Sequence, residues 1–114
     1  MNAKIRYSAQ ALDDLEAIWN YLAVDCDNAR AAQRIVGDIM NRVDRLADMP
    51  ESGQSLDSQC IIHSNYRFLA VGRYVAFYRY ENNCISIDRV LDSRSDFLKK
   101  LFGFTDSSPD FYAN

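Results

Sequence analysis

The chain has 114 residues, 48% of them hydrophobic, with only two prolines, four glycines and a formal net charge of −3. This length and composition predict one globular domain and exclude a disordered chain, and the acidic balance argues against extensive contact with nucleic acid. No apolar run approaches the roughly 18 residues of a membrane-spanning helix, and the first residues lack the apolar stretch of a signal peptide, so we expect a cytoplasmic protein without a membrane partner.

The first residues predict a short strand followed by a helix. Residues 4–7 alternate polar and apolar side chains, as a half-buried strand does. Ser8 follows and is a favourable N-cap residue for a helix. Apolar residues then recur at steps of three and four, which predicts a buried helical face made of Leu12, Leu15, Ile18, Trp19 and Leu22. Acidic residues, Asp14 among them, fall on the opposite side of this helix.

A second apolar run predicts a second helix. The polar segment 25–28 interrupts the first pattern, and Pro50 and Gly53 end the second. Its periodic apolar residues are Ala32, Ile35, Val36, Ile39, Val43 and Leu46. Two amphipathic helices joined by a short polar link form an antiparallel hairpin, and both need a shared surface that covers their apolar sides.

After a loop over residues 50–59, the chain predicts three strands rich in Tyr, Phe, Val and Ile. They cover residues 66–71, 74–80 and 84–91. Gly72 stands in the first connection and Asn82-Asn83 in the second, and both residue types tolerate the positive φ of tight antiparallel turns. The tyrosines and phenylalanines along these strands favour cross-strand packing, with a stacking platform for bases as the alternative.

These elements predict an α+β fold in the order β-α-α-β-β-β, in which the helix hairpin packs on one face of a small antiparallel sheet. The first strand is expected to add to the three-stranded meander. Residues 95–102 are predicted to form a short closing helix. We therefore assign residues 1–102 to one domain and residues 103–114 to a polar tail that frays at the chain end.

Neither a metal nor a cofactor is expected. Cys26, Cys60 and Cys84 lie far apart without a Cys-x-x-Cys pair, whereas a closed zinc site needs about four soft ligands at short spacings. We expect buried, reduced thiols. The glycine-rich patterns that bind nucleotides and the helical histidine pairs of metalloproteases do not occur. His63, the single histidine, is expected to be structural rather than a general base.

Five arginines lie in or beside the predicted strands, and they are the candidate residues for binding a target or a partner: Arg67, Arg73, Arg79, Arg89 and Arg94. Guanidinium groups bind carboxylates or phosphates through paired hydrogen bonds and keep their charge near neutral pH. Strand alternation places Arg89 on the same face as Ile85, Ile87 and Leu91, so it is not expected to be free in water. The alternative is an internal salt-bridge cluster with Asp88, Asp92 and Asp96.

Several short patterns occur in an order that resembles a known family. They are Tyr7-Ser8, Pro50-Glu51-Ser52-Gly53, Tyr66-Arg67, Tyr78-Arg79 and the segment 85–96, Ile-Ser-Ile-Asp-Arg-Val-Leu-Asp-Ser-Arg-Ser-Asp. Over residues 4–102 this order resembles the RelE/ParE superfamily of bacterial type II toxins. The resemblance implies a small toxin with a helix hairpin packed on an antiparallel sheet. It also implies a cognate antitoxin that wraps and silences the toxin, and it admits a toxin dimer within that complex.

The superfamily has two kinds of target. RelE-like members cleave mRNA on the ribosome with lysines, arginines and a tyrosine, or with a Glu/His set, whereas ParE-like members inhibit DNA gyrase. Here no lysine occurs between Lys4 and Lys99, and Leu98 stands near the position where a catalytic tyrosine is expected. The segment 89–96 is closer to the ParE-like pattern, although Asp92 stands where a histidine is common.

We therefore expect a ParE-like growth inhibitor that binds DNA gyrase without enzymatic activity. The alternative is a metal-independent endoribonuclease that acts on ribosome-bound mRNA. Its candidate catalytic residues are Arg67, Arg94, His63 and Glu51. A third hypothesis follows from the missing catalytic groups. It is an inactive family member that serves as an antitoxin-binding regulatory module.

Overall fold

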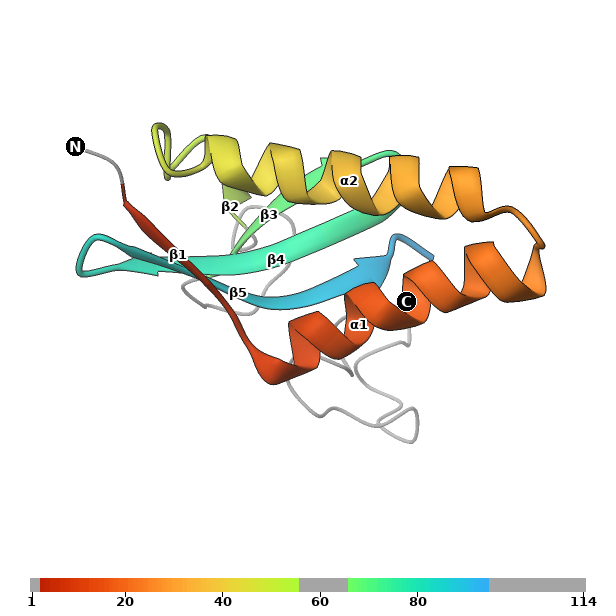
Figure 1. Ribbon diagram of the computed structural model, residues 1–114. Helices are drawn as coiled ribbons and strands as arrows, with labels where there is room; N and C mark the ends of the chain where they lie inside the picture. Colours follow the sequence, from red (N-terminus) through yellow and green to blue (C-terminus); the bar gives the residue numbers. More distant parts are fainter. Residues whose placement is uncertain (1–2, 56–65, 95–114) are drawn as a thin grey trace, which may run out of the picture.

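The computed structural model describes residues 3–55 and 66–94 of the chain. The elements are β1 (Lys4–Tyr7), α1 (Ala9–Asn20), a π-helix η1 (Tyr21–Asp25), α2 (Ala29–Arg45), β2 (Gln54–Ser55), β3 (Arg67–Val71), β4 (Tyr74–Glu81) and β5 (Cys84–Asp92). Helices α1 and α2 lie side by side across the sheet (Figure 1), which confirms the predicted α+β class. Within the described ranges, no helix is long and apolar enough to cross a membrane.

Some predictions lie outside the described residues. These are the closing helix at 95–102, the tail at 103–114, and the roles of Cys60, His63 and Asp96. Among the described cysteines, Cys84 is half-buried but Cys26 is exposed, so the expectation of a buried thiol is wrong for Cys26. Cys26 follows η1 in the polar link between the helices, where little packs over it.

The sheet has the order β1-β5-β4-β3-β2. Strands β3, β4 and β5 form the predicted antiparallel meander. Strand β1 adds to it beside β5 but runs parallel, from Lys4 opposite Cys84 to Tyr7 opposite Ile87. The sheet is therefore mixed rather than antiparallel throughout, because no tight turn joins β1 to β5 and forces their directions to oppose. The two-residue strand β2 was predicted as loop, since it is too short to show an alternating pattern.

Both predicted turns of the meander are confirmed. Gly72 has φ +61°, and Asn82 and Asn83 have φ +52° and +59°. Two consecutive positive φ angles are typical of the hairpin turns that match the right-handed twist of the strands. These turns fix which residues of β3, β4 and β5 face one another, and so they position the arginines of the sheet.

Helix α1 begins at the predicted cap. The Ser8 hydroxyl accepts a hydrogen bond from the Ala11 N–H (2.9 Å) and donates one to the Asp88 carbonyl oxygen (2.8 Å), so the cap also fastens α1 to β5. The buried row of α1 contains Ala11, Leu15 and Ile18. Leu12 and Trp19 were predicted on this row but are 53% and 39% exposed, because they lie at the border of the apolar stripe and the sheet covers only its centre.

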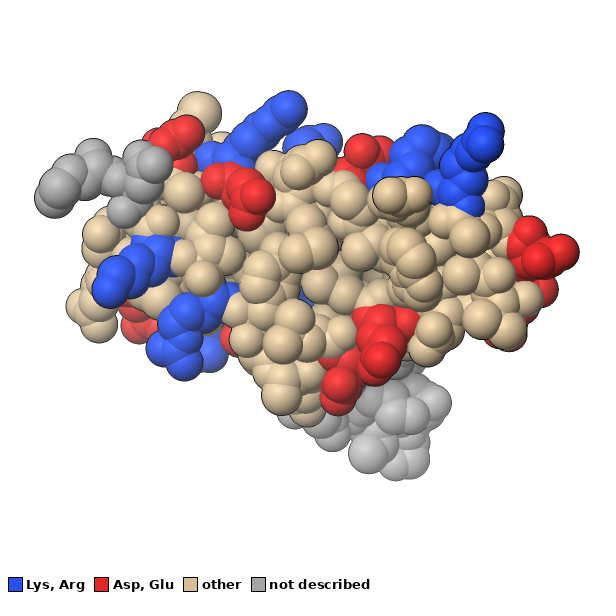
Figure 2. All heavy atoms as spheres, in the orientation of Figure 1, with Lys and Arg blue, Asp and Glu red and all other residues tan. Residues whose placement is uncertain are grey.

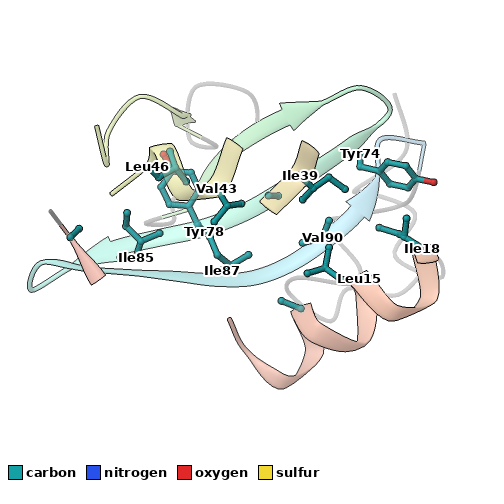
Figure 3. Packing of buried hydrophobic residues seen from close by; sticks show 13 residues of the cluster. Leu15, Ile18, Ile39, Val43, Leu46, Tyr74, Tyr78, Ile85, Ile87 and Val90 are labelled. Atoms are coloured by element: carbon teal, nitrogen blue, oxygen red, sulfur yellow. The ribbon is translucent and has the colours of Figure 1, made fainter. Parts of the chain in front are cut away.

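The core lies between the helices and the sheet (Figure 3). It includes Ile39, Val43 and Leu46 from α2 and its C-cap, and Ile85, Ile87 and Val90 from β5. Tyr74 and Tyr78 of β4 are buried within it, which confirms packing rather than a stacking platform for these two rings. A second, smaller cluster, centred on Phe77 and Leu91, lies apart from this core.

A β-bulge interrupts the pairing of β4 with β5. Phe77 pairs with Arg89, but the next residue, Tyr78, pairs with Ile87, so Asp88 is the extra residue of β5. The bulge reverses the alternation. Ile87 remains in the core, whereas Arg89 shares its face with Leu91 and Phe77 on the other side of the sheet. The prediction that Arg89 lies on the face of Ile85 and Ile87 is therefore wrong.

Candidate functional site

Arg89 is paired with a carboxylate from α1. Its Nε and Nη2 donate to the two carboxylate oxygens of Asp14 at 2.7 and 2.9 Å, and both side chains are less than one-fifth exposed. The Val90 N–H donates to the same carboxylate at 2.9 Å. Of the aspartates offered as partners of Arg89, Asp88 and Asp92 pair with other arginines, and Asp96 lies outside the described residues. Asp14, expected to face solvent, pairs with Arg89 instead.

The bulge residue Asp88 holds another arginine. Its Oδ2 accepts hydrogen bonds from the Tyr66 hydroxyl (2.7 Å) and from the Arg79 Nε (3.0 Å). The Arg79 guanidinium also lies 5.5 Å from the centre of the Tyr66 ring. Burial and the hydrogen bond to Asp88 raise the pKa of Tyr66 to about 12. Arg79 is therefore engaged within its own chain.

Arg67 fastens the segment that follows α2. Its Nη1 donates to the carbonyl oxygen of Gly53 (3.0 Å), and its Nη2 lies 3.9 Å from the exposed carboxylate of Glu51. The Tyr78 hydroxyl accepts from the Gly53 N–H (3.0 Å) and donates to the Pro50 carbonyl oxygen (2.9 Å). Arg67 and Tyr78 together tie this segment to the sheet.

Arg73, in the turn between β3 and β4, and Arg94, just after β5, are the most exposed of the five arginines. Arg73 donates from Nε to Asp92 Oδ2 at 2.9 Å and remains 46% exposed. The Arg94 N–H donates to Asp92 Oδ1 at 2.9 Å, while its 77% exposed guanidinium reaches Asp92 only at 3.4 and 3.5 Å. The hydrogen bonds from the Arg94 N–H and from Arg73 hold the pKa of Asp92 well below its usual range.

An open groove of about 460 Å³ lies between α1 and the end of the sheet formed by the start of β4 and the end of β5. Its lining residues are Asp14, Ala17, Ile18, Tyr21, Arg73, Tyr74, Val90, Leu91, Asp92 and Arg94. The middle of this groove is apolar and aromatic, and its charged groups are the two paired aspartates and two arginines. Tyr21 lies in η1 and was not among the predicted site residues, because these were chosen for their charged or titratable groups.

The structure separates the predicted site residues into two places. Arg67 and Glu51 lie near one end of the sheet, whereas Arg73 and Arg94 border the groove at the other. Arg67 pairs with Tyr78 of β4, while Asp92, two residues before Arg94, pairs with Tyr74. Four residues of strand correspond to about 13 Å. No group of three His, Cys, Asp or Glu side chains that could hold a metal ion occurs within residues 3–55 and 66–94.

Comparisons with known proteins place the chain in a family. Residues 5–97 match the family model described as the ParE toxin of the type II toxin-antitoxin system parDE. A chain of the chromosomal ParDE system from P. aeruginosa has 23% sequence identity and a TM-score of 0.66, with 79% of this chain and 95% of that chain covered. A chain of the RelBE2 toxin–antitoxin complex from Mycobacterium tuberculosis has 16% identity and a TM-score of 0.58, with 81% and 99% covered.

No curated protein shows a significant sequence match to the chain. The two solved structures share the fold of a helix pair on a mixed sheet with this protein. The family model spans most of the chain and confirms the sequence-based preference for a ParE-like over a RelE-like toxin. The chain belongs to the ParE family of toxins from type II toxin-antitoxin systems.

Proposed function

We propose that this toxin arrests growth in the cytoplasm by binding DNA gyrase, without catalysing a reaction, and that a cognate antitoxin neutralises it. Gyrase is the target that the sequence resemblance implies for ParE-like members. Similarity to chains of two toxin–antitoxin systems supports an antitoxin partner. The observation that carries the non-enzymatic part of the proposal is the separation of Arg67 from Arg94 in the sheet.

This separation argues against the endoribonuclease alternative. Metal-free cleavage of RNA needs a proton carrier and cationic groups that meet at one phosphate. Arg67 points its Nη1 at the Gly53 carbonyl oxygen of its own chain, and Arg94 belongs to the other end of β4 and β5, about 13 Å away along the strands. Glu51, the described candidate proton carrier, accompanies Arg67 only.

The exposed arginines at the end of the sheet form the proposed contact surface for gyrase. Arg79 and Arg89 are held by Asp88 and Asp14, and Arg67 is held by main-chain carbonyl oxygens. Arg73 is also held, by Asp92, and is 46% exposed, close to the 44% of Arg79, whereas Arg94 is 77% exposed and its guanidinium makes only long contacts to Asp92. A binding inhibitor needs such accessible groups, since rim charges set the rate and specificity of association.

The helix-covered side supports a separate contact with an antitoxin. Figure 2 shows a broad uncharged band across this side, with lysine, arginine, aspartate and glutamate side chains around its border. Leu12 and Trp19 of α1 and Met40 of α2 are large apolar residues exposed on the helices. Exposed apolar surface of this kind is typical of a protein-binding face. An antitoxin segment that covers these residues would remove their apolar surface from water.

The proposed function is tested by adding the purified chain to plasmid supercoiling by DNA gyrase and, separately, to cell-free translation. We expect supercoiling to stop and translation to continue. Translation that stops while supercoiling continues would make the ribosome the target. If both reactions continue, the chain is an inactive family member, and the antitoxin-binding hypothesis replaces the proposal.

A further inference from the structure

We propose that the groove between α1 and the end of β4–β5 receives a segment of the inhibited protein in which an apolar side chain lies next to a carboxylate. This inference rests on the proposed function, because it assigns the groove to the target rather than to the antitoxin. It adds the chemistry that the target must present: an apolar anchor and one acidic group.

The floor of the groove suits the apolar anchor. Ile18, Tyr74 and Leu91 line it and are almost fully buried. The main core fixes the positions of Ile18 and Tyr74, and the smaller cluster around Phe77 fixes that of Leu91. Tyr21 stands at the border and is 44% exposed, which leaves part of its ring available to a partner. The volume of about 460 Å³ is in the range of sites that enclose a few side chains. A buried apolar anchor of this kind supplies much of the affinity of a protein interface.

The charges at the groove favour a carboxylate. The Asp14 oxygens accept three hydrogen bonds from Arg89 and Val90, so the carboxylate of Asp14 is already satisfied. Asp92 is engaged by Arg73 and by the Arg94 N–H. Both aspartates that line the groove are therefore engaged, whereas the Arg94 guanidinium is 77% exposed and makes only long contacts to Asp92, which leaves it able to bind an incoming carboxylate.

A protein segment fits this groove better than a nucleic acid does. A phosphate backbone is bound by several cations in a row, whereas here two exposed arginines stand beside Asp92, and the chain carries a net charge of −3. The apolar floor offers nothing to a ribose or a phosphate. An apolar centre with a charged border is the usual composition of a protein–protein contact.

The chemistry of the occupant is tested by titrating the full-length, isotope-labelled chain with acetyl-leucyl-glutamate amide and following its amide resonances by NMR. We expect the largest shifts at Tyr21, Tyr74, Leu91 and Arg94. The matched acetyl-leucyl-glutamine amide should bind about fivefold more weakly, as expected for the loss of one exposed ion pair. Equal binding of the two peptides, shifts centred elsewhere, or stronger shifts with a short single-stranded oligonucleotide would overturn the proposal.

The assignment to the target is tested by supercoiling with two matched variants. Arg94→Gln removes the exposed guanidinium at the groove. Arg6→Gln makes the same change at an exposed position of β1 away from the groove, since the pairing partner of Arg6, Ser86, lies six residues before Asp92 in β5. We expect Arg94→Gln to raise the concentration for half-inhibition of gyrase about fivefold and Arg6→Gln to leave it unchanged.

The two proposals fail in different ways. If the unmodified chain does not inhibit supercoiling, the gyrase proposal is wrong. If it inhibits and Arg94→Gln inhibits equally well, gyrase remains the target but does not occupy this groove. A melting temperature for Arg94→Gln within about 2 °C of the unmodified chain is the control for folding, and it is expected because the hydrogen bond from the Arg94 main-chain N–H to Asp92 is retained.

Discussion

Asp14 accepts three hydrogen bonds from β5, although 75 residues separate it from Arg89. Beyond Ile87, β5 has no pairing with β1, and the Asp14 carboxylate satisfies the Val90 N–H on that part of the strand. An unpaired strand edge invites pairing with other chains, so this contact protects the edge as well as holding Arg89. Arg89, one of the five arginines that the sequence offered as partner-binding residues, is thus engaged within its own chain.

We predict that Asp14→Asn lowers the free energy of unfolding by about 3 kcal/mol, because it removes the charge from one partner of an ion pair whose two side chains are less than one-fifth exposed. Asp13→Asn is the matched control on the exposed side of the same helix and should change stability by less than about 0.5 kcal/mol. Urea unfolding of both variants gives the two values. An equally small effect for Asp14→Asn would show that the pair contributes nothing to the fold.

Asp92 gives the stability a defined pH dependence. Its pKa is lower in the folded chain than in the unfolded chain, so its contribution is present above the unfolded pKa of about 4 and is lost as the pH falls toward the folded value. We predict that Asp92→Asn is less stable than the unmodified chain by about 1 kcal/mol at pH 7 and that this difference shrinks below about pH 4. Denaturant titrations from pH 7 to pH 3 measure it. A difference that stays constant over this range would contradict the assignment.

At the scale of the elements, two glycines have opposite roles. Gly53 approaches the sheet so closely that a Cβ would meet the Tyr78 hydroxyl and would lie 2.8 Å from the Phe68 carbonyl oxygen. Gly37 lies within α2, where a Cβ would have no atom within 4 Å. Glycine weakens a helix by about 1 kcal/mol relative to alanine, and no close contact among the described residues requires a glycine at position 37.

We predict that Gly37→Ala stabilises the protein by about 1 kcal/mol and that Gly53→Ala destabilises it by about 2 kcal/mol, because the second substitution breaks the hydrogen bonds of the Tyr78 hydroxyl. Thermal unfolding of the two alanine variants tests the pair. Effects of the same sign would mean that the close approach at Gly53 does not govern the position of the segment after α2.

The elements themselves were largely predictable, since they depend on local signals. Ser8 as a cap, the apolar period of α2 and the asparagines of the last turn all act within a few residues. The bulge at Asp88 was not predictable, because one inserted residue moves every later side chain to the other face without changing the composition of the strand. The pairing of Asp14 with Arg89 was not predictable either, because the two residues lie 75 positions apart and no local sequence pattern connects them.

At the scale of the whole molecule, the fold presents two different surfaces. The helix-covered side shows a broad uncharged band (Figure 2), and the helices carry the exposed apolar residues Leu12, Trp19 and Met40. The end of the sheet presents Arg73 and Arg94 beside the groove. A toxin with two such surfaces can be neutralised at one of them or at both.

The central claim is that this toxin inhibits by binding rather than by chemistry. The most direct measurement is the concentration of toxin that halves plasmid supercoiling, determined at several gyrase concentrations. For a tight-binding inhibitor this value rises in proportion to the gyrase concentration, and inhibition needs amounts of toxin comparable to those of gyrase. Inhibition by far smaller amounts, growing with time, would indicate a catalytic toxin, and the absence of inhibition at a large excess would contradict gyrase as the target.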